Sequence, residues 1–223
     1  MNDGFKENPW LVMDAAGPSS YVGISENGHW KALYPTEGPS MENLHELVRR
    51  ALREMSLSLE ELEGVQYAEG PGSTLGLRLS AMFLQILLQT PRLSHWSCCS
   101  YNNLEVAAVA QMDETRAASF SLFAPWKKGH YHRARVDQLV TPKIVLDNCD
   151  ETALHEVDPL FVRLGLRNAA IPKGAREIAY PIERVPELLF VHRDRLHSVS
   201  SLNPYSPVPV AFARWEGKRH CGA

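Results

Sequence analysis

The sequence predicts an α/β fold, in which a mixed sheet carries helices on both of its faces. Three observations support this fold class. Short apolar runs typical of strands open the chain, and the Asn27-Gly28 pair between two of them is typical of a β-hairpin. Beyond the hairpin, apolar residues recur at helical spacing, and strands then alternate with helices. Hairpin strands followed by helix-crossover strands produce a sheet with both antiparallel and parallel pairs.

Taken in order, the first half of the chain is expected to be regular throughout. The predicted strands cover residues 10–13, 21–25, 29–34, 65–68 and 93–98. The predicted helices cover residues 40–55, 75–88 and 102–112, with a short helix after the capping box that Ser58 and Glu61 form. Residues 35–39 begin and end with proline and are expected to interrupt the third strand. Because the helix over 75–88 has few polar residues, we expect it to be largely buried.

The second half of the chain is less regular. Strands are predicted over residues 118–123 and 131–136, joined by a loop over 124–130, and short strands over 142–146 and 161–164. A charged helix is predicted over residues 185–196. Residues 204–209 contain three prolines and are expected to be extended, and residues 210–213 are expected to add an edge strand.

Composition excludes several classes of protein. The chain has 223 residues, enough for one large domain or two small lobes, and 44% of them are hydrophobic. The net charge of −3 argues against a wholly basic nucleic-acid-binding surface. The four cysteines lack a C-x-x-C spacing, so we expect neither a disulfide framework nor a zinc knuckle, and we expect a reducing cytoplasm. No secretory signal is visible, and the longest apolar run, 79–88, is about half a membrane span, so no membrane association is expected.

A glycine-rich turn between a strand and a helix is the most informative motif. Gly70 and Gly72 flank Pro71, so the backbone can turn sharply there, and Ser73 and Thr74 can cap the helix that follows. A strand, such a turn and a helix start can hold a phosphate or carboxylate. The motif is neither a P-loop nor the dinucleotide-binding fingerprint.

The favoured interpretation of this turn is structural. Gly76 would let the helix pack closely on the sheet. If Gly72 needs a positive φ, a side chain at that position would strain the turn.

Asp14, directly after the first strand, admits two interpretations. Its carboxylate could face a phosphate or magnesium ion, or it could cap its own turn, which we favour. Phosphoryl transfer of the actin type needs further acidic groups and a second phosphate loop, and neither is found. We therefore assign no catalytic residue.

Other reactive side chains give weaker signals. His130 and His132 would share a strand face, but no third ligand has recognisable spacing, so we expect no metal site. Cys98 and Cys99 are expected to pack rather than react. Lys127 and Lys128 belong to a basic, aromatic hairpin that could touch RNA, although a solvated rim is the favoured interpretation.

Three segments of the chain carry a resemblance to a known family. They are Leu11-Val12-Met13-Asp14-Ala15-Ala16, Ala68-Glu69-Gly70-Pro71-Gly72-Ser73-Thr74-Leu75-Gly76-Leu77-Arg78 and residues 207–214. In this order they resemble the opening strand and turn, the G-P-G-S-[FY]-T-G-[LV]-R signature and the Pro-Val-Tyr-Leu-Arg segment of the TsaB (YeaZ) proteins of bacterial threonylcarbamoyladenosine synthesis in transfer RNA. Two segments depart from the pattern, Ser40-Met41 at the first long helix and residues 125–132 on the second-lobe hairpin.

The resemblance implies a degenerate, actin-like (ribonuclease-H-type) fold in two lobes. We expect a first lobe over residues 1–115 and a smaller, degenerate second lobe over 116–223, whose C-terminal segment packs back on the first. A nucleotide- or phosphate-facing turn would comprise Asp14, Gly70, Gly72, Ser73, Thr74, Gly76 and Arg78.

The function that the resemblance implies is that of a non-catalytic scaffold subunit. It would bind and stabilise the catalytic paralogue TsaD, with the ATPase TsaE joining the complex, and it would form a homodimer when alone. Contact with transfer RNA would be indirect. We expect no cofactor in the chain itself, and ATP or ADP with magnesium only at a partner interface. The predicted partner interface lies on the first long helix and comprises Leu44, His45, Val48, Arg49, Leu52 and Arg53.

Two alternatives remain open. The chain could be a small-molecule kinase or ATPase of the actin-like superfamily that uses Asp14 and residues 70–76 for phosphate. It could also be an orphan dimeric interaction module. Magnesium-dependent ATP turnover by the isolated protein would distinguish the enzyme from the other two.

Overall fold

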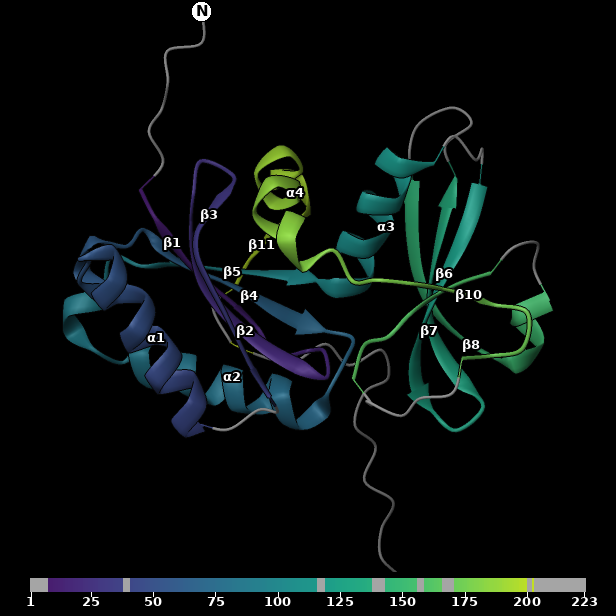
Figure 1. The fold of residues 1–223 in the computed structure, drawn as a ribbon, viewed down its shortest axis with the longest axis horizontal. Helices are drawn as coiled ribbons and strands as arrows, with labels where there is room; N and C mark the ends of the chain where they lie inside the picture. Colours follow the sequence, from purple (N-terminus) through teal and green to yellow (C-terminus); the bar gives the residue numbers. More distant parts are fainter. Residues whose placement is uncertain are drawn as a thin grey trace, which may run out of the picture.

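The computed structural model describes residues 8–37, 41–115, 119–137, 143–155, 159–165, 171–199 and 202. These residues form two sheets of six and five strands, which lie side by side in Figure 1 with helices around and between them. None of the described helices is long and apolar enough to cross a lipid bilayer. The interpretations that concern residues 204–214 lie outside the described residues.

The first sheet combines antiparallel and parallel pairing. Its strands are β1 (Trp10–Asp14), β2 (Ser19–Glu26), β3 (His29–Glu37), β4 (Gly64–Gly70), β5 (Ser97–Asn102) and β11 (His197–Ser198). In space they follow the order β11-β5-β4-β1-β2-β3. β1 pairs antiparallel with β2 and parallel with β4, and β4 pairs parallel with β5. The predicted mixed sheet is therefore confirmed.

The hairpin between β2 and β3 forms where the Asn27-Gly28 pair predicts it. Asn27 and Gly28 have φ values of 53° and 76°, which is the left-handed geometry of a tight two-residue turn. The prediction that 35–39 interrupts the strand is wrong at its start, because β3 continues through Pro35, opposite Tyr21. β3 is an edge strand of the described sheet, where a residue without an N–H is tolerated.

Two helices cover one face of the first sheet, α1 (Met41–Met55) and α2 (Thr74–Leu88). Leu44, Val48 and Ala51 of α1 pack into a core with Leu84 of α2 and with the sheet. Between the two helices, Ser58 and Glu61 form the predicted capping box on a 3₁₀ turn, with Glu61 Oε2 accepting from the Ser58 amide over 2.7 Å.

The strand predicted over 93–98 is misplaced. A 3₁₀ turn occupies Pro91–Leu93, and the strand β5 begins only at Ser97. Leu93 and Trp96 are buried as core side chains of the preceding loop, and the Trp96 indole donates to the Leu59 carbonyl over 3.0 Å. Their apolar character reflects this packing and not a strand.

The opposite face of the first sheet is covered by α3 (Asn103–Glu114) and α4 (Val185–Val191). Val106 and Val109 of α3 and Leu188 of α4 pack with Val12 of the central strand. The predicted helix over 185–196 is shorter in the structure, because it ends at Val191 and a 3₁₀ turn follows at Arg193–Arg195. Helices on both faces of the sheet match the predicted architecture.

The second sheet is also mixed, and it shares α3 with the first. Its strands are β6 (Ser119–Lys127), β7 (His130–Asp137), β8 (Lys143–Asp150), β9 (Leu160–Val162) and β10 (Arg176–Ile178), in the order β10-β9-β6-β7-β8. Leu104, Ala107 and Ala108 of α3 pack against this sheet. The loop predicted over 124–130 is mostly strand, and β10 and β11 were not predicted.

The chain returns to the first sheet after completing the second. We call residues 176–198 the return segment, since it begins with β10, continues through α4 and ends as β11 beside β5. Figure 1 shows α4 on the face of the first sheet opposite α1 and α2.

Candidate functional site

Asp14 lies at the carboxyl end of β1, where the parallel strands β4 and β5 also end. In open α/β sheets this edge is the usual place for a ligand. The Asp14 side chain is only 2% exposed. Oδ1 accepts a hydrogen bond from the Ala16 amide over 3.0 Å, as a residue that caps its own turn would.

The second carboxylate oxygen of Asp14 is held by three side chains. Oδ2 accepts from the Tyr101 hydroxyl over 3.1 Å, from Asn103 Nδ2 over 2.8 Å and from the Tyr180 hydroxyl over 2.9 Å. Asn103 Nδ2 also lies 2.9 Å from the Tyr180 hydroxyl. With the Ala16 amide, the carboxylate thus receives four hydrogen bonds, all from its own chain.

Burial and hydrogen bonding oppose each other at this carboxylate. Burial raises the pKa of Asp14, while the four donors favour its ionised form and act in the other direction. Burial also raises the pKa of Tyr101 and of Tyr180 well above the usual range, and the neighbouring Asp14 adds to the effect. Both phenols therefore stay protonated and remain hydrogen-bond donors.

The glycine turn packs against the backbone that follows Asp14. A Cβ added at Gly72 would lie 2.3 Å from the Ala16 carbonyl oxygen, and one added at Gly76 would lie 2.1 Å from the Ala15 carbonyl oxygen. The Ser73 amide donates to the Ala16 carbonyl over 2.8 Å. Gly76 therefore allows the close packing that the structural interpretation predicted.

The conformational reason given for Gly72 has to be corrected. The positive φ belongs to Gly70, at 118°, and Gly72 is not among the glycines with positive φ. Glycine is needed at position 72 because any side chain there would meet the backbone of Ala16.

A segment of the second half closes this turn. The Gly165 amide donates to the same Ala16 carbonyl over 2.8 Å, and a Cβ on Gly165 would lie 3.1 Å from the Gly72 carbonyl carbon. The Ser73 hydroxyl accepts from the Gly76 amide over 3.2 Å, as predicted for a helix cap. The amides of Ser73 and Gly76 are thereby used within the protein.

These residues do not fit a bound nucleotide phosphate with magnesium. Such a ligand needs an accessible carboxylate and free backbone amides at the turn. Asp14 is buried and saturated with donors, and Ala16 and Gly165 occupy the space beside Gly72. Of the predicted phosphate-facing set, Thr74 and Arg78 are exposed, and neither is among the residues that bond to Asp14.

Three residues of the Asp14 network were missed by the sequence analysis. Tyr101 and Asn103 sit at the β5–α3 junction, where only a helix start was predicted. Tyr180 lies 166 residues beyond Asp14 along the chain. No local pattern marks these residues, because their pairing depends on how the chain returns to the first sheet.

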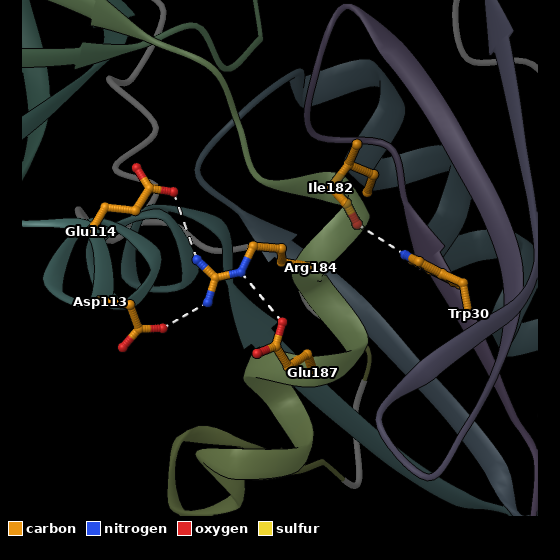
Figure 2. Close-up of polar contacts among 6 residues, drawn as sticks. All are labelled: Trp30, Asp113, Glu114, Ile182, Arg184 and Glu187. Carbon is orange, nitrogen blue, oxygen red and sulfur yellow. Dashed lines mark hydrogen bonds and ion pairs between the residues drawn. The ribbon is translucent and has the colours of Figure 1, made fainter.

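Polar contacts tie the return segment to the first sheet and to α3. The Trp30 indole donates to the Ile182 carbonyl over 3.0 Å. Arg184 forms ion pairs with Asp113 over 2.7 Å, Glu114 over 3.7 Å and Glu187 over 3.3 Å. Figure 2 shows the guanidinium between these carboxylates, with the Trp30 contact on the other side of the segment. Tyr180 is thereby held in place above Asp14.

No metal-binding cluster of three or more His, Cys, Asp or Glu side chains occurs in the part of the chain that the structure describes. His132 is buried, and its Nδ1 lies 2.8 Å from Asn148 Oδ1. His130 Nδ1 lies 3.2 Å from the Lys128 carbonyl. In the basic hairpin, Lys127 stacks over the Trp126 ring at 4.6 Å.

The predicted partner interface on α1 divides into core and surface. Leu44 and Val48 are 0% and 3% exposed and lie in the core, so they cannot form the surface contact that was predicted for them. The reason is that the apolar stripe of α1 faces the sheet. Leu52 is partly buried against the same core, and the other three predicted residues, His45, Arg49 and Arg53, are exposed.

The burial predicted for α2 is wrong for one of its faces. Leu75, Met82 and Ile86 are 60%, 54% and 60% exposed. These residues lie seven and four positions apart and so share one side of the helix. The opposite side, including Leu77, Ala81 and Leu84, is buried as predicted.

Comparisons with known proteins agree with this fold. The family model of TsaD, tRNA N6-adenosine threonylcarbamoyltransferase, matches residues 38–113. YeaZ from Pseudomonas aeruginosa matches with a TM-score of 0.63 at 13% identity, over 89% of this chain and 99% of that one. A structure described as an uncharacterized protein with similarity to peptidase YeaZ from Pseudomonas aeruginosa matches with a TM-score of 0.63 at 14% identity, over the same shares of the two chains. No curated protein matches the sequence.

The fold thus defines the class of protein. The chain has the actin-like fold of two lobes, each built on a mixed sheet. Within that class, the YeaZ structure and the YeaZ-like structure each match the chain along 89% of its length, and the predicted resemblance to the TsaB (YeaZ) proteins is confirmed.

Proposed function

We propose that the protein is a non-catalytic subunit that binds and stabilises a TsaD-like paralogue in the synthesis of threonylcarbamoyladenosine in transfer RNA. The observation that carries this proposal is the exposed apolar side of α2. Leu75, Met82 and Ile86 present aliphatic side chains to solvent on one helix face. Apolar surface of this kind is costly in water and is typical of a surface that a partner covers.

α1 extends this surface with charge. It packs beside α2 on the same face of the first sheet, and its residues His45, Arg49 and Arg53 are exposed. Arg49 lies 4.0 Å from Glu46, with both side chains about 60% exposed, so this ion pair is weak. An apolar centre with a charged rim is the usual composition of a protein interface.

The family match supports the choice of a TsaD-like partner. The matched segment 38–113 contains both α1 and α2, so a TsaD-like lobe would present helices of similar shape. Lobes that resemble each other can pair across an approximate two-fold axis, and the same surface would form a homodimer when no paralogue is present.

The Asp14 network supports a subunit without catalytic chemistry. A carboxylate that is buried and accepts four hydrogen bonds from its own chain has no remaining position for magnesium or a phosphate. In this proposal the catalytic groups belong to the paralogue, and ATP or ADP with magnesium binds only at the interface with a partner such as a TsaE-like ATPase. Transfer RNA is contacted through the partners, and the complex is cytoplasmic.

The division of the chain belongs to the same proposal. Residues 1–115 form the first lobe, and residues 116–223 form the second lobe with its return to the first.

Substitutions on α2 test the proposal directly. Leu75→Glu with Ile86→Glu places two charges on the apolar face without touching the core, because both side chains are about 60% exposed. We expect the dissociation constant for the TsaD-like paralogue to rise about thirtyfold or more, which is the effect of losing a central interface residue. Analytical ultracentrifugation of the mixed proteins measures this change.

Val191 provides the matched control. It is 65% exposed on α4, which covers the opposite face of the sheet, so Val191→Glu should leave association unchanged. Arg49→Glu with Arg53→Glu should weaken binding by a smaller factor through the rim. If the α2 variant binds the paralogue as tightly as the wild type, the proposed interface is wrong. If neither the paralogue nor a second copy binds the wild type, the scaffold function is wrong.

A further inference from the structure

A cavity of about 270 Å³ lies between the first sheet and the return segment. It is close to the lower end of the range typical of small-molecule sites, about 300–1,000 Å³. Trp10 at the beginning of β1 lines one side, and Leu189 and Phe190 of α4 line another. It is distinct from the Asp14 network, which lies at the carboxyl ends of the same strands.

The sheet contributes polar side chains to this cavity. Gln66 of β4 pairs in register with Cys99 of β5, and Cys99 pairs with Ser198 of β11, so the three residues form a row on one face of the sheet. All three line the cavity, and so does Ser25, which lies opposite Trp10. The rest of this face is covered by an apolar core, in which such a row would be unfavourable.

Two of these polar groups have no side-chain partner in the described part of the chain. The Gln66 carboxamide is half-buried, and Ser25 is 5% exposed, yet neither side chain forms a hydrogen bond there. Both side chains line the cavity, so their polar atoms are placed to bond with a ligand there.

One charged side chain lines the cavity in the described part of the chain. Among its described lining residues, Arg193 is the one that carries a charge. Its guanidinium lies 4.3 Å from the centre of the Phe190 ring, and its Nε donates to the Phe190 carbonyl over 3.1 Å. The hairpin tip also packs against Phe190, since a Cβ on Gly28 would lie 2.9 Å from Phe190 Cβ. Arg193 is thus held at the cavity through its contacts with Phe190.

We propose that this cavity is a binding site for a small amphipathic anion with an aromatic or aliphatic body. The body would pack against Trp10, Leu189 and Phe190, the anionic group would face Arg193, and Gln66 and Ser25 would bond with polar atoms of the ligand. Such a site is independent of the partner surface on α2, which lies on the opposite face of the sheet.

The test uses 1-anilinonaphthalene-8-sulfonate as an amphipathic anion and N-phenyl-1-naphthylamine, the same ring system without the sulfonate, as its neutral control. The readout is alkylation of Cys99 by N-ethylmaleimide, followed residue by residue with mass spectrometry. The sulfonate dye also binds other apolar surfaces, so its total binding would not isolate the cavity. The alkylation rate of Cys99 does, because Cys99 lines the cavity. Burial raises the pKa of the Cys99 thiol, so all rates are compared at one pH of about 8.5.

We expect the anionic dye to slow alkylation of Cys99 and to leave the rate at Cys149, in the second sheet, unchanged. Arg193→Gln should raise the dye concentration that gives half-maximal protection of Cys99 about tenfold, since it removes a charge-assisted contact. Arg193→Lys should keep most of the protection, and Arg53→Gln on α1 should keep all of it. The neutral dye should protect Cys99 less than the anionic dye does. Its protection of Cys99 should be the same in the wild type and in Arg193→Gln.

Two results would overturn the proposal. The first is an unchanged Cys99 rate at saturating concentrations of both dyes, because nothing would then enter the cavity. The second is an equal loss of protection for the two dyes in Arg193→Gln, because Arg193 would then only shape the cavity wall. A thermal melt of each variant confirms that the fold is intact before the rates are compared.

Discussion

Tyr180 donates its hydroxyl to the carboxylate of Asp14 over 2.9 Å, although 166 residues separate the two along the chain. Asp14 ends the central strand of the first sheet, and Tyr180 follows β10 of the second. This hydrogen bond therefore connects the carboxyl end of β1 to the segment that follows the second sheet, and it occupies an oxygen of the one carboxylate predicted to face a phosphate.

Removing this hydroxyl should destabilise the protein. Tyr180→Phe keeps the ring but leaves Asp14 with three donors, and a bond to a carboxylate contributes about 1.5–3 kcal/mol. We expect the free energy of unfolding in urea to fall by that amount. Tyr21→Phe is the matched control, because the Tyr21 hydroxyl has no hydrogen bond among the described residues, and it should change stability by less than about 0.5 kcal/mol. Equal effects of the two changes would show that the Asp14 contact contributes nothing.

A side chain at Gly72 should also destabilise the protein. The Cβ of Gly72→Val would overlap the Ala16 backbone, so we expect a loss of about 1–3 kcal/mol or more in the free energy of unfolding. Gly17→Ala is the comparison, since its Cβ would meet the nearest atom at an ordinary 3.4 Å. A thermal melt of Gly72→Val that matches the wild type would contradict the packing described for the turn.

The purified protein should not hydrolyse ATP. The Asp14 carboxylate is saturated, and Gly165 closes the turn, so neither group can position magnesium or a phosphate. Typical enzymes turn over about one to a thousand times per second. A steady-state rate above about one per minute that disappears in a folded Asp14→Ala variant would show that the site is catalytic.

His132 should make stability depend on pH. Burial lowers the pKa of His132 to about 4, from an ordinary value near 6.5. Between these values the unfolded chain binds a proton that the folded protein does not, so stability falls as the pH drops from 6.5 toward 4. The loss should reach about 3 kcal/mol at the lower end of that window.

The comparison that isolates this effect is with His132→Asn. Its free energy of unfolding should fall less between pH 7 and pH 4.5 than that of the wild type, measured by urea denaturation. His45→Asn, on the exposed surface of α1, should retain the wild-type dependence. If the wild type and His132→Asn lose equal stability over that range, His132 is not the titrating group.

Local patterns predicted most elements of the first half. The Asn27-Gly28 turn, the cap at Ser73 and the stripe of α1 each depend on neighbouring residues, so the sequence contains the signal. The predictions failed where the structure of a segment depends on packing against residues far away in the sequence. The predicted strand over 93–98 includes Trp96, but Trp96 lies in a loop. Its buried indole donates a hydrogen bond to the carbonyl of Leu59.

The candidate sites show the same contrast between features set by neighbouring residues and features set by distant ones. The capping interpretation of Asp14 and the packing role of Gly76 could be derived from residues close in sequence. The donors Tyr101, Asn103 and Tyr180 could not, because they meet Asp14 only after both sheets have formed. The exposed side of α2 was also missed, since an apolar helix gives no sign of which face its own chain leaves uncovered.

The return of the chain to the first sheet has a consequence for synthesis on the ribosome. When residues 1–115 have emerged, β5 still lacks its partner β11, and the core that Val185, Leu188 and Leu189 complete is open to water. A nascent chain at this stage presents both an unpaired strand edge and an apolar face, which are the features that chaperones bind. Protein production interrupted before residue 198 should therefore yield aggregates and not a functional half.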